Sequence, residues 1–324
     1  MPMAPAPDLL QRFRGGLSAL GCTPEPTRPI GIAVSGGPDS LALLLLAHAA
    51  LPDAVTAATV DHGLRAEAAE EARGVARLCA RIGVPHAILT PEPGALAGGG
   101  SVQARARALR YRLLGRWADE AGADWVATAH HVDDQAETFL MRAARGAGLA
   151  GLAGVRGQVT IAGMAIVRPL LGWRRRELAD IVAEQMIEAV DDPSNRDPAH
   201  DRTAFRALLA HAPRLAPARL ARVAANLAEA EDALAWAMAA LAPDRLRDEG
   251  DTLRLVDPHT LPREFRRRLV AAAIAQLTGA GAVRGDAVDR MVRLLDSGRA
   301  ATLAGIQAKA GADWLFSAAP PRRR

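Results

Sequence analysis

The chain has 324 residues and a mass of 34.0 kDa, about twice a typical domain of ~150 residues, so two domains are expected. Half of its residues are hydrophobic and 23% are charged, which is typical of folded globular proteins and excludes wholesale disorder. Its 40 basic and 36 acidic residues leave a net charge of +4. Lys309 is the single lysine, so a Walker A lysine is excluded and a Schiff-base enzyme is disfavoured.

Cysteine usage and hydropathy indicate where the protein works. Cys22 and Cys79 lack the Cys-x-x-Cys spacing of redox and zinc motifs, as expected in a reducing cytosol. Residues 1–13 do not have the pattern of a secretory signal. The longest apolar run, from Leu41 to Leu51, is shorter than the ~20 residues that span a bilayer. We therefore expect a cytoplasmic protein with no membrane contact.

The amino-terminal half alternates short apolar, β-branched runs with helical patterns. We expect, in chain order, a strand over 30–35, a helix over 40–50, a strand over 54–60, a helix over 66–82, a strand over 86–90, a helix over 102–121, a strand over 125–129 and a helix that begins near 132–134. This alternation predicts an α/β fold with a doubly wound parallel sheet. Ligands of such sheets bind beyond the carboxyl ends of the strands.

Beyond about residue 210 the pattern changes. Helices are expected over 217–241, 262–277 and 286–295, with strand-like pieces over 252–256, 300–306 and 314–317. We therefore expect an α/β domain over residues 1–212 and a second, smaller, mainly helical domain over residues 213–324.

The most specific motif follows the first expected strand and consists of Ser35, Gly36, Gly37, Pro38, Asp39 and Ser40. Its two glycines allow a tight turn and close approach of a ligand to the backbone. The hydroxyls of Ser35 and Ser40, with the amides at the helix start, can hold phosphate oxygens without any lysine. The alternative is an ordinary strand-to-helix turn with Asp39 or Ser40 as the helix N-cap.

A second motif, over residues 128–138, follows the strand expected over 125–129. If a helix begins near residue 132, Asp134 and Glu137 lie one turn apart on the same face, and His130 lies beside them at the strand end. Such a cluster can bind a divalent metal, a cationic substrate or a proton in transit. Helix capping by Asp133, with exposed acids in the first turn, is the alternative.

A third signal combines two parts of the chain. Asp61 and His62 end the strand expected over 54–60, and an arginine-dense stretch surrounds Tyr111, with Arg105, Arg107, Arg110, Arg112 and Arg116. The arginines are suited to phosphate contacts with a nucleic acid or with ATP. The alternative is a solvated helix face in an arginine-rich protein.

Taken in order, these motifs resemble those of the tRNA(Ile)-lysidine synthase family, which belongs to the PP-loop ATP-pyrophosphatase superfamily. The matching segments are SGGPDS at 35–40, VDHGLR at 60–65, ARALRY at 106–111, TAHHVDDQAET at 128–138, RPLL at 168–171 and DDPSN at 191–195. The resemblance covers about residues 28–210 and implies an adenine nucleotide α-hydrolase-like fold. The second domain resembles the family's tRNA-binding domain only in outline.

The resemblance implies a ligase that forms a carbon–nitrogen bond. ATP would adenylate the C2 oxygen of the wobble cytidine, C34, in an isoleucine tRNA with a CAU anticodon, releasing pyrophosphate. The ε-amine of L-lysine would then displace AMP to form lysidine, and decoding would switch from AUG to AUA. The implied partners are this tRNA, L-lysine, ATP and Mg²⁺, and a homodimer is left open. The amine, with a free pKa of ~10.4, must lose a proton before it attacks.

The same resemblance assigns roles to residues. Ser35 to Ser40 would bind the ATP phosphates, with Asp61 and His62 near the nucleotide, and Asp39 would also hold Mg²⁺. Arg107 would stabilise charge in the transition state, while His130, Asp134 and Glu137 would recognise lysine or take part in catalysis. Arginines over 263–268 are expected to contact tRNA.

Two positions depart from the family pattern. Gln103 stands where the family often has glutamate, and Thr203 replaces an asparagine between Arg202 and Arg206, so the role of that segment stays open. Three other functions were weighed. A thiolating PP-loop tRNA enzyme is disfavoured because this sequence lacks suitably spaced cysteines. A metal-dependent phosphohydrolase built on His130, His131, Asp134 and Glu137 would leave the SGGPDS motif without a role. A non-catalytic RNA-binding protein would need more aromatic residues than 3%.

Overall fold

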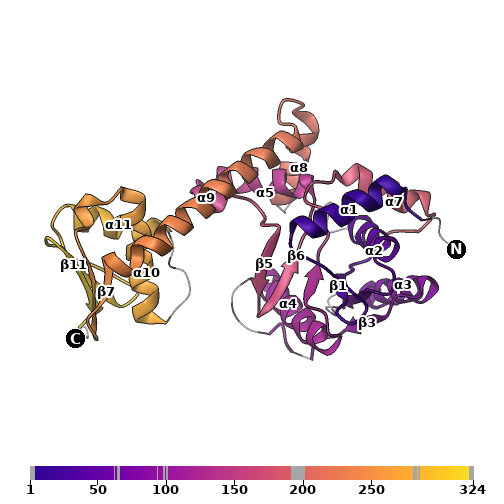
Figure 1. Cartoon of the computed structure of the whole chain (residues 1–324), viewed down its shortest axis with the longest axis horizontal. Coiled ribbons are helices and arrows are strands. Elements are labelled where there is room, and N and C mark those ends of the chain that lie inside the picture. Colours follow the sequence, from indigo (N-terminus) through magenta and orange to yellow (C-terminus); the bar gives the residue numbers. More distant parts are fainter. Residues whose placement is uncertain are drawn as a thin grey trace. The chain divides into compact units, whose positions relative to one another are not determined.

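A computed structural model describes residues 4–61, 63, 66–92, 94–97, 99, 101–190, 201–279, 283 and 285–320. The chain divides into two compact units, of which the first ends at Ala228 and the second begins at Glu229 (Figure 1). The division falls inside helix α9 (Pro217–Arg245), which begins just after the boundary expected at residue 212. Among the described residues, no helix is both long and apolar enough to cross a bilayer.

The first unit is built on a six-stranded sheet in the order β3-β2-β1-β4-β6-β5. The strands are β1 (Ile30–Ala33), β2 (Val55–Val60), β3 (His86–Leu89), β4 (Trp125–Ala127), β5 (Gln158–Ile161) and β6 (Met164–Val167). All neighbours pair in parallel except β5, which pairs antiparallel with β6. The expected α/β fold with a doubly wound parallel sheet is confirmed, with an antiparallel edge strand added.

Strand β1 lies between β2 and β4, with Ile30 paired to Val55 on one side and to Trp125 on the other. The chain therefore leaves β1 toward β2 and β3, and returns to the opposite side of β1 as β4. In open α/β sheets this reversal of strand order opens a crevice at the carboxyl ends of the two strands. The loops after β1 and β4 carry the two most specific motifs of the sequence, so the topology brings them together.

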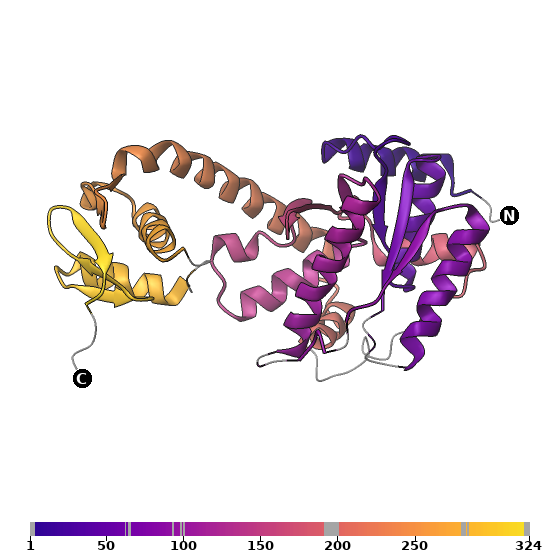
Figure 2. The ribbon, with the colours of Figure 1, turned by 90° about the horizontal axis from the view of Figure 1, so that it is seen from below.

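Helices cover both faces of this sheet (Figure 2). Its helices are α1 (Pro7–Ala19), α2 (Pro38–Ala50), α3 (Ala66–Ile82), α4 (Val102–Glu120), α5 (Val132–Ala144), α6 (Leu149–Leu152), α7 (Arg175–Glu184), α8 (Asp201–His211) and the start of α9. Residues of α1, α2, α3 and α7 share one hydrophobic core, and residues of α4 belong to another. Neighbouring residues of one strand alternate between the two, with Val167 in the first core and Ile166 in the second.

Helix α2 is buried on nearly its whole surface, including every residue from Ser40 to Ala47. Its sequence is apolar without helical periodicity, which is typical of a central helix covered on all sides. Packing between the sheet, α1 and α7 fixes α2, and with it the loop that precedes it. Helices α1, α7 and α8 and the β5–β6 hairpin were not among the elements expected from the sequence.

The second unit combines the end of α9, α10 (Arg263–Thr278) and α11 (Gly285–Asp296) with a five-stranded sheet in the order β7-β8-β11-β10-β9. Its strands, all antiparallel, are β7 (Leu246–Asp248), β8 (Thr252–Leu255), β9 (Ala301–Leu303), β10 (Ile306–Lys309) and β11 (Trp314–Ala318). The single strand expected over 300–306 is wrong. Ala304 and Gly305 have φ angles of 50° and 79° and form a two-residue hairpin turn, for which the sequence lacks the usual Asn or Asp.

The arginines at the start of α10 are engaged within this unit. Arg263 lies 2.7 Å from Asp289, Arg266 lies 2.5 Å from Asp296, and Arg268 makes two hydrogen bonds to Glu231. These pairs tie α10 to α11 and to α9. These arginines thus help to pack the unit, and their expected contact with tRNA stays a prediction.

We expect Leu44→Ala to lower the free energy of unfolding by about 3–5 kcal/mol, because Leu44 is fully buried in α2 and its truncation leaves a cavity. Val102→Ala, at a half-exposed position, is the control and should change stability by less than about 0.5 kcal/mol. Chemical denaturation of both variants measures the difference. Equal stabilities would contradict the central position of α2.

Candidate active site

The loop between β1 and α2 is shaped by hydrogen bonds among its own residues. The backbone N–H of Ser35 donates to Ser40 Oγ at 3.1 Å, and Ser40 Oγ–H donates to the carbonyl of Gly37 at 2.9 Å. Gly37, rather than Asp39 or Ser40, is the N-cap residue of α2. The loop therefore ends at a helix N-terminus with free N–H groups, the geometry that binds phosphate oxygens.

Gly36 is required by the shape of this loop. Its φ angle is +84°, and a Cβ atom there would lie 3.0 Å from Val190 Cγ2. Val190 also donates its N–H to the Gly36 carbonyl at 2.9 Å. The segment after α7 thus packs directly on the loop, and only glycine combines the left-handed backbone with this close approach.

Asp39 points one carboxylate oxygen toward a buried histidine and leaves the other without a partner. Its Oδ2 lies 3.4 Å from His131 Nε2. Its Oδ1 is buried and accepts no hydrogen bond from the residues that the structure describes. An uncompensated buried carboxylate oxygen is costly unless a cation or donor completes it. A hard cation such as Mg²⁺, which prefers oxygen ligands and binds phosphates at the same time, fits this oxygen.

His131 joins the loop of β1 to the loop of β4. It is fully buried and is the N-cap residue of α5, where its Nδ1 accepts the N–H of Asp134 at 3.3 Å. His131 Nε2 lies 3.4 Å from Asp39 Oδ2 and 3.5 Å from Asp134 Oδ2, and Arg175 Nε donates to it at 3.4 Å. His131, not Asp133, thus caps the helix.

Glu137 is buried with its charge neutralised by arginines. Its two carboxylate oxygens accept from Arg202 Nε at 2.8 Å and Arg206 Nε at 2.9 Å, and Arg175 Nη2 lies 3.4 Å away. Only 1% of its side chain is exposed. Asp134 is 14% exposed and lies 3.2 Å from Arg202. The acidic pair is therefore assembled as expected, but Asp134 is its accessible member.

Asp133 binds the residues at the start of α7. It binds Arg174 through both carboxylate oxygens and accepts the backbone N–H of Arg175 at 2.8 Å. Burial raises the pKa of Asp133, but these hydrogen bonds outweigh burial and hold the pKa below its usual value. Asp133 thus anchors the start of α7 to α5.

His130 lies at the carboxyl end of β4 with Nδ1 3.0 Å from Thr128 Oγ1. Burial lowers the pKa of His130 to about 4; Asp134 raises that pKa, while Arg168, Arg202 and Arg107 lower it further. The ring is therefore neutral at neutral pH. It can accept or donate a hydrogen bond, but it is a weak general base.

Arg107 comes from α4 and lies over the ring of Tyr111, with its Cζ 5.0 Å from the ring centroid. It is exposed, and its charge lowers the pKa values of both His130 and Arg168. The Arg107 charge therefore acts on the same histidine as Asp134 does. Arg168, which follows β6, was not a candidate from the sequence, although its charge acts on the same histidine.

Asp61 stands apart from this cluster. It follows β2, the neighbour of β1, so it shares the carboxyl edge of the sheet. Its carboxylate accepts the N–H of Gly63 at 2.9 Å, an ordinary Asx turn. His62 and the segment 191–200 lie outside the described residues, so their expected parts in the site stay predictions.

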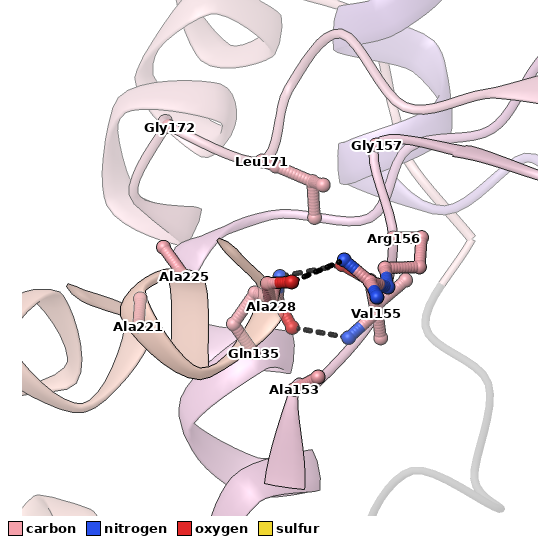
Figure 3. Close-up of a pocket in the computed structure, with 10 residues that line it drawn as sticks. All are labelled: Gln135, Ala153, Val155, Arg156, Gly157, Leu171, Gly172, Ala221, Ala225 and Ala228. Carbon is pink, nitrogen blue, oxygen red and sulfur yellow. Dashed lines mark hydrogen bonds between the residues drawn. The ribbon is translucent and has the colours of Figure 1, made fainter. Parts of the chain in front are cut away.

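A cavity of about 350 Å³ lies behind α5 and is lined in part by Ala221, Ala225 and Ala228 of α9 (Figure 3). The Gln135 amide spans it, donating to the Val155 carbonyl and accepting the Val155 N–H. Arg156 donates to the Ala228 carbonyl. Because these polar groups already bond one another, the cavity lacks the convergent, unsatisfied groups of a reaction site.

The metal-cluster alternative finds no support. Within the described part of the chain, no group of three or more His, Cys, Asp or Glu side chains is arranged to hold a metal ion. The cysteines do not suit sulfur transfer either. Both are buried, and burial raises the pKa of Cys22 to about 11 and the pKa of Cys79 to about 12, so neither forms the reactive thiolate.

A lysine-free phosphate loop at the switch point of an α/β sheet, with an acidic helix across the crevice, defines a PP-loop nucleotide-binding protein. Residues 14–212 match the family model described as a PP-loop domain. A U34-tRNA thiolase from Methanococcus maripaludis has the same fold, with a TM-score of 0.57 at 17% identity over 68% of this chain and 78% of that chain.

Curated relatives are similar over nearly the whole length. The chain is 49% identical to a tRNA(Ile)-lysidine synthase from Zymomonas mobilis subsp. mobilis, over 91% of this chain and 90% of the relative. It is 44% identical to a tRNA(Ile)-lysidine synthase from Novosphingobium aromaticivorans, over 96% of this chain and 94% of the relative. The chain belongs to the tRNA(Ile)-lysidine synthase family of ATP-dependent ligases.

The sequence does not predict the roles of two residues in the site. His131 precedes two aspartates, which is a helix N-cap position, but the sequence suggests it only as a metal ligand. Arg168 follows a strand that the sequence does not predict. Arg202 and Arg206 keep the spacing of the family pattern, with Thr203 between them, and both bind Glu137.

We expect the stability of the protein to fall as the pH drops from 6.5 toward 4. In this window the unfolded chain binds a proton at His130, whose ordinary pKa is 6.5, and the folded chain, with its lowered pKa of about 4, does not. Linkage then gives a slope of up to about 1.4 kcal/mol per pH unit, and this contribution is complete above pH 6.5. His130→Gln should flatten the curve relative to the unaltered protein, and urea titrations between pH 4 and 7.5 measure both. Parallel curves would contradict the assignment.

Proposed function

We propose that this protein forms lysidine at C34 of isoleucine tRNA with a CAU anticodon, using ATP and L-lysine. In the first step the C2 oxygen of the cytosine attacks the α-phosphorus of ATP and pyrophosphate leaves. In the second step the lysine ε-amine attacks C2, the C2–O bond breaks, and AMP leaves. The observation that best supports this proposal is the meeting of Asp39, His131 and Asp134, which joins the phosphate loop to an acidic pocket.

The loop from Ser35 to Ser40 supplies the nucleotide end of the site. The free N–H groups at the start of α2 and the serine hydroxyls face where phosphate oxygens would bind. Asp39, through its unpartnered Oδ1, would hold Mg²⁺. When bound, the ion neutralises charge that develops on the phosphates. His131 keeps the other carboxylate oxygen, Oδ2, directed away from it.

Asp134 is the better placed of the two acids to meet the lysine amine. Glu137 is covered, and three guanidinium groups already satisfy its charge. Asp134 is partly exposed and lies 3.2 Å from Arg202 and 3.9 Å from Arg175, so it keeps room to orient the ammonium and take its proton. Glu137 would act indirectly, by holding Arg202 and Arg206 in place. Neutral His130, beside them, would serve as a hydrogen-bond partner.

Exposed arginines of the second unit are the better candidates for tRNA contact. Arg290, Arg293 and Arg299 are exposed, and none has a carboxylate partner among the described residues. The arginines of α10, in contrast, are paired. We further propose that the protein works in the cytoplasm; the homodimer left open by the sequence stays a prediction that sedimentation would test.

The direct test is incorporation of radiolabelled lysine into unmodified isoleucine tRNA bearing CAU, with Mg-ATP. Label on this tRNA, matched by release of AMP and pyrophosphate, is expected, and methionine tRNA with the same anticodon is the control. Pyrophosphate release with another tRNA, without lysine incorporation, would keep the nucleotide chemistry and reject lysidine.

We expect Asp39→Asn to lower pyrophosphate release at least about 100-fold, because the amide keeps the shape of the carboxylate but loses the charge that attracts the metal. Mg²⁺ titration of ATP binding, followed by fluorescence of a labelled nucleotide, should show a weaker metal dependence. Asp61→Asn is the matched control at the same sheet edge and should have a smaller effect. Normal turnover of Asp39→Asn would contradict the metal assignment.

We expect a triple variant, Arg290→Ala with Arg293→Ala and Arg299→Ala, to weaken tRNA binding and to reduce its salt dependence by as much as about 3 in the log–log slope. Filter binding at several salt concentrations measures both. A matched double variant, Arg263→Ala with Arg266→Ala, breaks ion pairs inside the unit and should lower thermal stability more than tRNA affinity. The reverse pattern would place the RNA surface on α10.

A further inference from the structure

Arg168 is a buried cation that forms no ion pair with any described carboxylate. Only 5% of the residue is exposed, and one guanidinium nitrogen, Nη1, donates to the Arg156 carbonyl at 2.6 Å. Its Nε is buried and has no hydrogen-bond partner in the described part of the chain. Burial lowers the pKa of Arg168, and no carboxylate is among the neighbours that act on it. A buried charge of this kind is costly unless an anion completes it.

A second unsatisfied group lies beside Arg168. Tyr111 is 2% exposed, and its hydroxyl is close enough to raise the pKa of Arg168. That hydroxyl nevertheless makes no hydrogen bond of normal geometry with any described residue. Tyr111 comes from α4 and Arg168 from the end of β6, so two separate elements bring buried polar groups without a partner of normal geometry near each other.

The surroundings are positively charged. Arg107 and Arg110 both lie over the Tyr111 ring, at 5.0 and 5.4 Å. The Arg107 charge also reaches Arg168 and His130. The nearest acid identified around His130 is Asp134, which already binds Arg202. A group of arginines with donors left over, at the carboxyl edge of a parallel sheet, favours an oxyanion.

A partly buried arginine of the same unit, Arg142, is fully engaged within the fold. Burial also lowers the pKa of Arg142. Its Nη1 donates to two carbonyls, those of Gly151 and Gly154, at 2.7 and 3.0 Å. The Arg142 side chain has no unpartnered buried nitrogen. Arg142 therefore serves the fold, and Arg168 has an unused edge.

We propose that Arg168 and Tyr111 form a second anion-binding position, separate from the phosphate loop, that takes one oxyanion of a small substrate. This inference rests on the proposed function. The Nε edge of a guanidinium binds planar oxyanions through paired hydrogen bonds, and a tyrosine hydroxyl adds a third. The carboxylate of L-lysine is the expected occupant, because the phosphate loop already accounts for phosphates of ATP. A phosphate of ATP is the other source of the same chemistry.

The test compares Arg168→Gln and Tyr111→Phe with Arg142→Met as the matched control. For each protein, KM and kcat are measured for lysine, for lysinamide, which lacks the carboxylate, and for ATP. Equilibrium binding of lysine, lysinamide and tRNA is measured without turnover. If lysine provides the oxyanion, Arg168→Gln should weaken lysine binding about 10-fold or more and Tyr111→Phe should weaken it several-fold. Both variants should reduce the preference for lysine over lysinamide. If ATP provides it, the KM for ATP rises instead and the preference is kept.

Thermal stability separates binding from folding. Because the Tyr111 hydroxyl makes no hydrogen bond of normal geometry with any described residue, Tyr111→Phe should leave the Tm unchanged or raise it. Arg142→Met should lower the Tm, since two carbonyls lose their donor, and should leave the preference for lysine over lysinamide intact. A lower Tm for Tyr111→Phe would show that its hydroxyl is a structural group and would overturn the proposal.

Two further outcomes are decisive. If folded Arg168→Gln binds lysine and ATP with unchanged affinity, or if only its tRNA affinity changes, the proposed anion-binding position is wrong. The proposed function still stands in that case. Failure of the unaltered protein to incorporate lysine rejects the proposed function itself, and the equilibrium measurements on lysine and ATP then still decide whether Arg168 binds an anion.

Discussion

The buried ring of His131 connects the two halves of the site. It caps α5 through Nδ1 and faces Asp39 and Asp134 through Nε2, so the helix that carries the acids is fixed to the loop that would carry the phosphates. Because the ring is completely buried, its position depends on the packing of α2, α5 and α7 around it. A displacement of any of these helices would change the distance between nucleotide and acid pocket.

Charge is distributed unevenly around this ring. On the α8 side, Glu137 is neutralised by Arg202 and Arg206, so the acidic pocket expected from the sequence is largely occupied by the chain's own cations. On the β6 side, Arg168 and Arg107 surround neutral His130 with little acid to balance them. In the proposals made above, Asp134 would meet the ammonium of the amino acid and Arg168 its carboxylate.

The two units use arginine in different ways. In the second unit, arginines of α10 pair with carboxylates of neighbouring helices, whereas Arg290, Arg293 and Arg299 are exposed and have no ion pair with a described residue. An arginine-rich sequence therefore gives little information about where RNA binds. The distinction comes from the partners of each guanidinium, because a paired arginine loses its ion pair when it turns to a phosphate.

The sequence by itself determined most of the first unit. The helix over 66–82 has the expected bounds, and strands β1 to β4 appear where the alternation predicted them, because apolar periodicity is a local property. The phosphate loop and the acidic motif were also readable, since glycines and N-cap residues act within a few positions. The tertiary structure alone decided the long-range partners: that Glu137 binds Arg202 and Arg206, that Asp39 faces His131, and that Arg168 lies near Tyr111. The members of each set are far apart in the chain, and only the strand order and helix packing set their distances.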